Sequence, residues 1–211
     1  MRTILLALFV SIATNSIYAQ YVSVDTVKLN KAYRNLMASD SRENQEAYFK
    51  AFPADWMEYI ATYQYYENSL ENKKKNSQYH LAYKQVEAFG NLKVIPEDAY
   101  CKRLVYLAIG GRDDADAPNY LKSLLSQKMQ TMSNCIFNIV IKLKVGHQFE
   151  FWAFYWASPY SNKEDSEKLE YLQKLYKEKY PLEVKIMIDS FKYSNGKINL
   201  VSWGYMESDK K

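Results

Sequence analysis

At 211 residues the chain is long enough to bury a substantial core, and we expect one domain rather than two small ones. Its 28 lysines and arginines against 24 aspartates and glutamates give a net charge of only +4. A balance this small, spread along the chain, does not indicate a nucleic-acid-binding protein, and we predict no nucleic-acid partner. The lysine cluster at 73–75 lies between two asparagines and is interpreted as a solvated loop tip.

The first nineteen residues have the pattern of a secretory signal peptide. Arg2 supplies the positive charge, residues 4–12 supply the apolar segment, and residues 17–19 supply a cleavage site before Gln20. The apolar segment is shorter than the roughly 20 residues of a membrane span, which disfavours an uncleaved anchor. We therefore expect cleavage near Ala19 and a periplasmic or secreted mature protein. It would have no stable membrane span and would form a single helical domain over 20–211.

The first helices are predicted after residues 21–37, whose weak periodicity fits an extended arm followed by a short helix. Asp40 and Glu43 have the spacing of a capping box, so a helix is expected from there to Pro53. Pro53 is the predicted start of the next helix, with Asp55 in its first turn.

Four more helices are predicted after a polar loop at 68–76. Each shows an apolar stripe at helical spacing. The first of them ends near Gly90, and the second begins at Pro96 and ends at Gly110-Gly111. The third begins at the acidic residues of 113–116, and the fourth begins at Ser133 and breaks at Gly146.

Residues 149–160, FEFWAFYWASPY, contain seven aromatic side chains among twelve. Complete burial of one aromatic side chain contributes roughly 1.5 to 3 kcal/mol, so other elements must cover this segment. We expect it to form a seventh helix, ended by its proline, around which the chain is organised. The predicted core residues are Phe52, Trp56, Phe151, Trp152 and Tyr155.

In the C-terminal part, the sequence predicts a strongly amphipathic helix with one apolar and one lysine-rich face. This helix is expected to stop before Pro181. Residues 182–193 include β-branched residues, but no partner strand is visible, so a further helix is expected. Asn195-Gly196 indicates a turn, and 197–205 a small extended tail. The chain is therefore predicted to be all-α, with about eight helices in antiparallel hairpins that form an irregular bundle or a short solenoid.

Cys101 and Cys135 are the two cysteines of the chain. In an oxidising compartment they can form a disulfide if their helices are neighbours, or they can remain buried thiols. A thiol enzyme would need a basic partner, and His80 and His147 are the two candidates. A periplasmic hydrolase or thiol enzyme that uses Cys101 or Cys135 with a histidine is therefore the alternative to a binding protein.

Asp113, Asp114 and Asp116 are the most concentrated acidic residues. They lack the alternating ligands and central glycine of a calcium loop, so helix capping is the preferred interpretation and no metal is predicted. No nucleotide, phosphate or hydrolase motif occurs, and Gly110-Gly111 lacks a third glycine and a preceding strand. We predict no cofactor and no enzymatic activity.

Twenty tyrosines are the unusual feature of the composition. Tyrosine gives a large contact area at low entropy cost and keeps a polar tip, which is why it is frequent in binding hot spots. An aromatic surface without a catalytic set favours a binding protein. We predict a contact surface formed by Tyr65, Tyr66, Asp113, Asp114 and Tyr160. A peptide or small-ligand carrier with an aromatic groove is a third hypothesis.

Three blocks of the sequence resemble a known family. They are Ala51-Phe52-Pro53 with the tyrosines of 63–66, the stretch 109–117 with its Gly-Gly and Asp-Ala-Asp-Ala, and 151–159. Together they resemble a family of small exported helical proteins of Bacteroidetes. The last block departs from that pattern, because Ala157, Ser158 and Tyr160 occupy the places of its usual aspartate, glycine and histidine.

The resemblance implies an interaction module rather than an enzyme. Its exported members are expected to be immunity proteins that neutralise periplasmic toxins delivered by rival bacteria through type VI secretion. On this interpretation the partner is a toxin protein, and the chain needs a rigid scaffold and a shaped surface but no active site.

Overall fold

The computed structural model describes residues 24–64, 77–112, 116–157 and 163–196. Within these ranges the chain is helical and contains no strand, so the predicted all-α class is confirmed. The elements are α1 (Thr26–Ala38), α2 (Arg42–Ala51), α3 (Trp56–Tyr63), the 3-10 turn η1 (Tyr79–Leu81), α5 (Ala82–Gly90), α6 (Glu97–Ala108), α7 (Asp116–Val140), α8 (Val145–Trp156), α9 (Lys163–Tyr176) and α10 (Pro181–Ser194).

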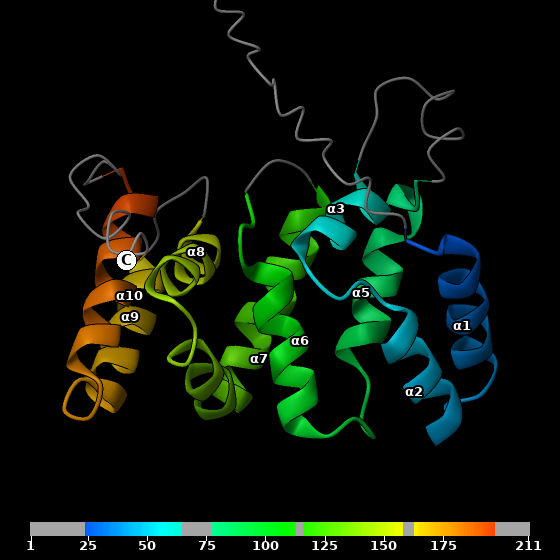
Figure 1. Ribbon diagram of the computed structural model, residues 1–211, viewed down its shortest axis with the longest axis horizontal. Helices are drawn as coiled ribbons and strands as arrows, with labels where there is room; N and C mark the ends of the chain where they lie inside the picture. The colour runs from blue at the N-terminus through cyan, green and yellow to red at the C-terminus, as the bar shows by residue number, and fades with distance from the viewer. Residues whose placement is uncertain (1–23, 65–76, 113–115, 158–162, 197–211) are drawn as a thin grey trace, which may run out of the picture.

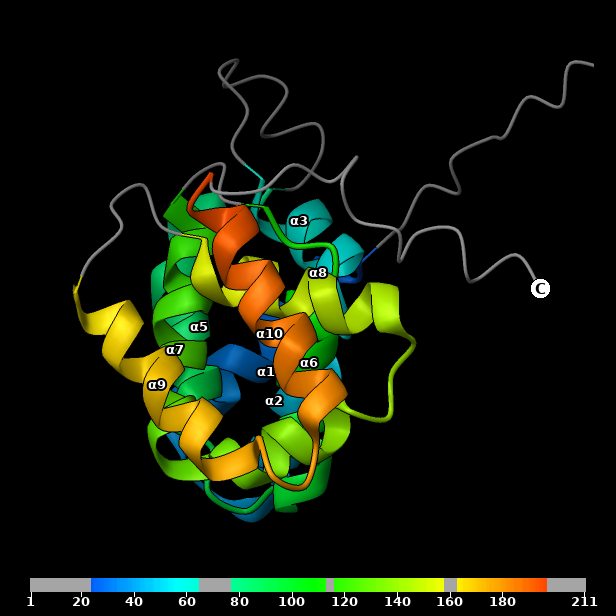
Figure 2. The same ribbon diagram turned by 90° about the vertical axis from the view of Figure 1, so that its left-hand side faces the viewer.

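The helices follow one another along the longest axis of the molecule in nearly chain order, from α1 at one end to α10 at the other (Figure 1). Helices close in sequence pack together: α1 on α2, α6 on α7, and α10 on α8. Figure 2 looks along this axis from the α10 end, with α9 and α10 in front. Within the ranges described, no helix is both long enough and apolar enough to cross a bilayer.

The first helices agree with the prediction in position but not in every limit. The short helix expected within 21–37 is α1, with 13 residues, the start of the expected arm lies outside the described residues, and α2 is capped by Ser41 instead of Asp40. The Ser41 hydroxyl accepts a hydrogen bond from the backbone N–H of Asn44, 3.3 Å away. The Asp40 carboxylate instead accepts one from the side-chain amide of Gln45, at 2.7 Å. Because the Asp40 carboxylate is bonded to Gln45, the neighbouring Ser41 hydroxyl caps α2 in its place.

Pro53 does not begin a helix, contrary to the prediction. It lies between α2 and α3, and Asp55 is the cap of α3: its carboxylate accepts a hydrogen bond from the backbone N–H of Glu58 at 2.9 Å. The Glu58 carboxylate in turn accepts one from the N–H of Ala54, at 2.7 Å. These two bonds stabilise the free N–H groups at the start of α3 in the manner of a capping box.

α7 combines the fifth and sixth predicted helices. Its backbone leaves the helical conformation at Met132 (φ −126°, ψ 21°), next to Ser133, where the second helix was expected to start. α6 ends as predicted, because Gly110 adopts φ +76°, a conformation that side chains with a Cβ rarely take. Residues 181–194, for which a strand was the alternative, form α10.

The core is built from stacked aromatic rings contributed by helices all along the chain. Near the α2 end, Phe52 stacks on Phe89 with ring centroids 4.2 Å apart. Near the α9 end, Phe137 stacks on Tyr176 at 3.8 Å and lies beside Trp152. Of the predicted core residues, Phe52, Phe151, Trp152 and Tyr155 are buried, whereas Trp56 is partly exposed and packs on Tyr59 and Phe154.

Candidate functional site

The predicted contact surface lies outside the described residues. Tyr65, Tyr66, Asp113, Asp114 and Tyr160 all fall in the ranges 65–76, 113–115 and 158–162. Their part in binding stays a prediction. The described neighbours of these residues have structural contacts: Tyr63 is wholly buried, and the Asp116 carboxylate accepts a hydrogen bond from the hydroxyl of Tyr79 at 2.6 Å.

An open hollow of about 340 Å³ lies on the surface between α2 and α6. Its lining combines aromatic, small and cationic side chains: Phe49, Ala54, Ala99, Lys102, Arg103 and Tyr106. We call it the α2–α6 groove. The two helices that form it are far apart in the sequence, and the connection between α2 and α3 contributes Ala54.

Arg103 forms a fixed wall of the α2–α6 groove. One nitrogen of its guanidinium donates to the backbone carbonyls of Phe49, Phe52 and Pro53, at 3.1, 2.7 and 3.0 Å. The guanidinium also lies over the Phe49 ring, 4.6 Å from its centroid. Burial lowers the pKa of Arg103, an effect that the nearby carboxylates of Glu58 and Asp55 oppose. Arg103 remains charged, since a guanidinium is not deprotonated in proteins.

Lys102 and Tyr106 form the exposed rim of the same groove. They are four residues apart on α6 and therefore share a face of the helix. The Lys102 ammonium lies over the Tyr106 ring, 5.9 Å from its centroid, and 40% of Tyr106 is exposed. This rim presents an aromatic ring and a positive charge to solvent, and tyrosine is one of the residues enriched in hot spots of protein interfaces.

A second, smaller hollow of about 240 Å³ lies between α5 and α7. Tyr83 stands at its edge, with more than half of its side chain exposed, and meets Tyr120 edge to face with ring centroids 5.4 Å apart. The aromatic surplus of the sequence is therefore divided. Most of the described rings fill the core, whereas Tyr83, Tyr106 and Tyr171 are exposed.

Ser126, Tyr155 and Lys168 form the one polar cluster in the described ranges that resembles a catalytic arrangement. The Lys168 ammonium donates to the Ser126 hydroxyl at 3.3 Å. It also pairs with Glu164 at 2.8 Å and with Asp165 at 3.7 Å. Burial raises the pKa of Tyr155 to about 12, which keeps this phenol protonated. Neither the ammonium of Lys168 nor the protonated phenol of Tyr155 is a base for Ser126.

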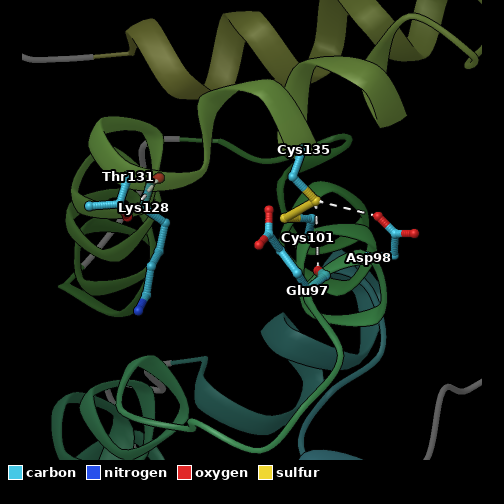
Figure 3. The surroundings of a disulfide bond; sticks show 6 residues. All are labelled: Glu97, Asp98, Cys101, Lys128, Thr131 and Cys135. Atoms are coloured by element: carbon cyan, nitrogen blue, oxygen red, sulfur yellow. Dashed lines mark hydrogen bonds between the residues drawn. A yellow bond between two sulfur atoms is a disulfide. The ribbon is translucent and has the colours of Figure 1, made fainter.

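Cys101 and Cys135 form a disulfide bond between α6 and the second half of α7, with Cα atoms 6.2 Å apart. The carboxylates of Glu97 and Asp98 flank the two sulfur atoms (Figure 3). In the described part of the chain, the group of potential ligands around the disulfide contains Glu97 and no histidine. The thiol–imidazole pair that a cysteine enzyme requires is therefore not assembled at these residues.

The α2–α6 groove was not predicted from the sequence. The apolar residues of α6 that were assigned to the core leave Lys102 and Tyr106 on the opposite face, so an exposed tyrosine was recognisable. The opposite wall of the groove, formed by Phe49 and Ala54, was not recognisable from the sequence.

Comparisons of the chain with protein-family models, with curated proteins and with solved structures found no match.

Proposed function

We propose that this chain is an exported protein-binding module, and most specifically a periplasmic immunity protein that neutralises a cognate antibacterial toxin by direct binding. The α2–α6 groove carries the binding part of the proposal, because it is a preformed hollow with an aromatic and cationic rim. The resemblance described above supplies the more specific part, the toxin and the type VI secretion context.

The groove suits a macromolecular partner for a physical reason. Arg103 is fixed by three carbonyls and by the Phe49 ring, so little conformational entropy is lost when a partner covers it. The Lys102 ammonium at the rim would attract an acidic residue of the partner and raise the rate of association. The hollow is open rather than enclosed, unlike the cavities that bury most of a small ligand.

The described residues give less support to an enzyme. The hydroxyl of Ser126 contacts an ammonium rather than an imidazole, and Cys101 and Cys135 are joined in a disulfide with carboxylates rather than an imidazole beside them. Residues 157–160 also lack the aspartate and the histidine that the resembling family usually has at these places. A binding protein requires none of these groups, because it acts by covering its partner.

The test is protection of bacteria from a toxin encoded beside this gene. Cells that express the toxin in the periplasm should grow when they also express the chain with its N-terminal segment, and purified toxin should copurify with it. Unchanged killing in the presence of the folded protein would refute the immunity function.

The place of binding is tested separately. Tyr106→Ala and Lys102→Glu should each weaken toxin binding about fivefold or more, as expected for interface residues that contribute over 1 kcal/mol. Tyr171→Ala is the matched control, since Tyr171 is an exposed tyrosine on α9. Protection that survives both groove variants would show that the chain binds its partner through another surface.

A further inference from the structure

The disulfide is surrounded by groups that bind metals. The sulfur atoms of Cys101 and Cys135 and a carboxylate oxygen of Glu97 all lie within 4.8 Å of one another. The Asp98 carboxylate adds an oxygen 3.8 Å from the Cys135 sulfur. Figure 3 shows that both acidic residues belong to α6, as does Cys101, whereas Cys135 approaches from α7.

Two features of the fold bring these residues together. Glu97 and Cys101 are four residues apart in the first turns of α6, so they share one face of the helix. The non-helical backbone at Met132 then redirects the second half of α7, and Cys135 lies one turn beyond the break. The cluster is therefore a product of the α6–α7 packing and not of a local sequence motif.

We propose that reduction of the Cys101–Cys135 disulfide creates a zinc site in which both thiolates and the Glu97 carboxylate are ligands. Zinc prefers sulfur, nitrogen and carboxylate ligands in tetrahedral geometry, at about 2.3 Å from sulfur and about 2.0 to 2.2 Å from oxygen. Ligand atoms around one ion are then up to about 4 Å apart, so small side-chain movements suffice. Two thiolates select a soft ion such as Zn²⁺ over Ca²⁺ or Mg²⁺.

The charges in the reduced state also favour a cation. Two thiolates beside Glu97 and Asp98 would place four negative charges close together, and a divalent ion removes much of this repulsion. Three protein ligands leave a fourth position, which a water molecule or the Asp98 carboxylate can take. The same two helices are thus joined by a disulfide in the oxidised chain and by zinc in the reduced chain.

The redox step uses a dithiol as the reductant. One thiolate of the dithiol attacks the Cys135 sulfur, because Cys101 is fully buried and Cys135 is partly exposed. The Cys101–Cys135 bond breaks, Cys101 leaves as a thiolate, and the second thiol of the dithiol resolves the mixed disulfide. The protein gains two electrons and two protons, and the dithiol becomes a disulfide. Zinc binding then releases both protons from the two thiols.

The experiment uses the full chain, reduced with a phosphine, freed of reductant without oxygen and titrated with Co²⁺ as a spectroscopic probe. One equivalent should produce a thiolate-to-cobalt charge-transfer band with tetrahedral d–d bands, and Zn²⁺ should displace it. The oxidised chain should give no such band. Glu97→Gln should lower the affinity for Co²⁺ about tenfold or more. Glu150→Gln, which removes an exposed glutamate of α8, is the matched control and should change nothing.

Three results would overturn the proposal. The first is the absence of a charge-transfer band in reduced protein that retains its helical circular dichroism. The second is an equal affinity in the wild type, Glu97→Gln and Cys135→Ser. The third is a loss of helical structure on reduction that Zn²⁺ does not reverse, because the site requires α6 and α7 to remain packed.

Discussion

Tyr63 donates a hydrogen bond to the side-chain oxygen of Gln85, 2.7 Å away, and neither side chain is exposed to solvent. The amide nitrogen of Gln85 donates to the side-chain oxygen of Asn30, and the amide nitrogen of Asn30 donates to Gln78, both at 2.9 Å. Tyr48 completes the network by donating to the backbone carbonyl of Gln85. These polar groups hold α1, α2, α3 and α5 in one arrangement, because a buried amide must find its partners.

Tyr63→Phe should lower the free energy of unfolding by about 1 to 3 kcal/mol. The substitution keeps the ring in the core but removes the donor, which leaves the Gln85 oxygen buried without that hydrogen bond. Urea denaturation measures the change. Tyr171→Phe, at a tyrosine with 58% exposure, should change the value by less than about 0.5 kcal/mol. Equal stability of the two variants would contradict this role of the network.

Gly111→Ala should destabilise the protein by about 1 to 3 kcal/mol, as expected for overpacking. A Cβ at this residue would lie 2.7 Å from the Phe154 ring carbon Cγ and 2.9 Å from the Ala108 carbonyl oxygen, and neither can move easily. Gly90→Ala is the comparison, because its nearest contact at 2.7 Å is the end of the flexible Leu124 side chain. Thermal unfolding should show a larger loss for Gly111→Ala, and the reverse order would refute this account.

The protein should lose stability in alkaline solution because of its buried tyrosines. Burial raises the pKa of Tyr48, Tyr59 and Tyr63 well above the ordinary value and that of Tyr155 to about 12. These phenols titrate more easily in the unfolded chain, whose tyrosine pKa is about 10. Their stabilising effect is therefore complete below pH 10 and is lost as the pH rises from 10 through 12.

The alkaline loss is measured by urea denaturation at a series of pH values together with tyrosinate absorbance. Tyr155→Phe should reduce the fall in unfolding free energy above pH 10 by up to about 2 to 3 kcal/mol, because two pH units correspond to that amount. Tyr171→Phe should leave the fall unchanged. Tyrosinate formation by all tyrosines near pH 10 without loss of helical structure would contradict the prediction.

The sequence predicted the helices well because each has an apolar stripe, and it predicted their ends less well. Asp40 and Ser41 are adjacent residues that can both cap α2, and the contact of Asp40 with Gln45 decides between them. Pro53 is compatible with the first turn of a helix, but Asp55 caps α3 two residues later. Such choices depend on contacts between elements, which a periodic pattern does not contain.

The candidate site was less predictable for the same reason. The aromatic segment 149–160 was expected to be covered by other elements, and Trp152 and Trp156 are buried, but the sequence did not identify α10 as the helix that packs on α8. Tyr106 becomes a rim residue only because Phe49 of another helix lies across the hollow. The pairing of Cys101 with Cys135 was one of two open alternatives, and the packing of α6 on α7 decides it.

Replacement of both cysteines by alanine should lower the free energy of unfolding by about 3 to 4 kcal/mol. The bond closes a loop of 34 residues, and the entropy of the unfolded chain rises when that loop is opened. Denaturation of the wild type with and without a phosphine should give a similar difference. A loss below about 1 kcal/mol would show that helix packing alone holds α6 and α7 together.

Arg103→Met should destabilise the protein by about 1.5 to 3 kcal/mol, because Arg103 replaces a hydrogen-bond donor that Pro53 lacks. The Phe49 carbonyl in the last turn of α2 would ordinarily accept from the N–H of residue 53, but Pro53 has none. The Arg103 guanidinium supplies the missing donor and also bonds the carbonyls of Phe52 and Pro53. Methionine keeps an apolar stem in place and removes the charged hydrogen bonds.

Lys102→Met is the control for Arg103→Met. Lys102 is exposed, so its substitution should change the free energy of unfolding by less than about 0.5 kcal/mol. Arg103→Lys should fall between the two, because an ammonium can donate to the carbonyls but cannot lie flat over the Phe49 ring. Urea denaturation of the three variants gives the order. If Arg103→Met and Lys102→Met were equally stable, water would be an adequate donor at the end of α2, and the wall of the α2–α6 groove would not depend on Arg103.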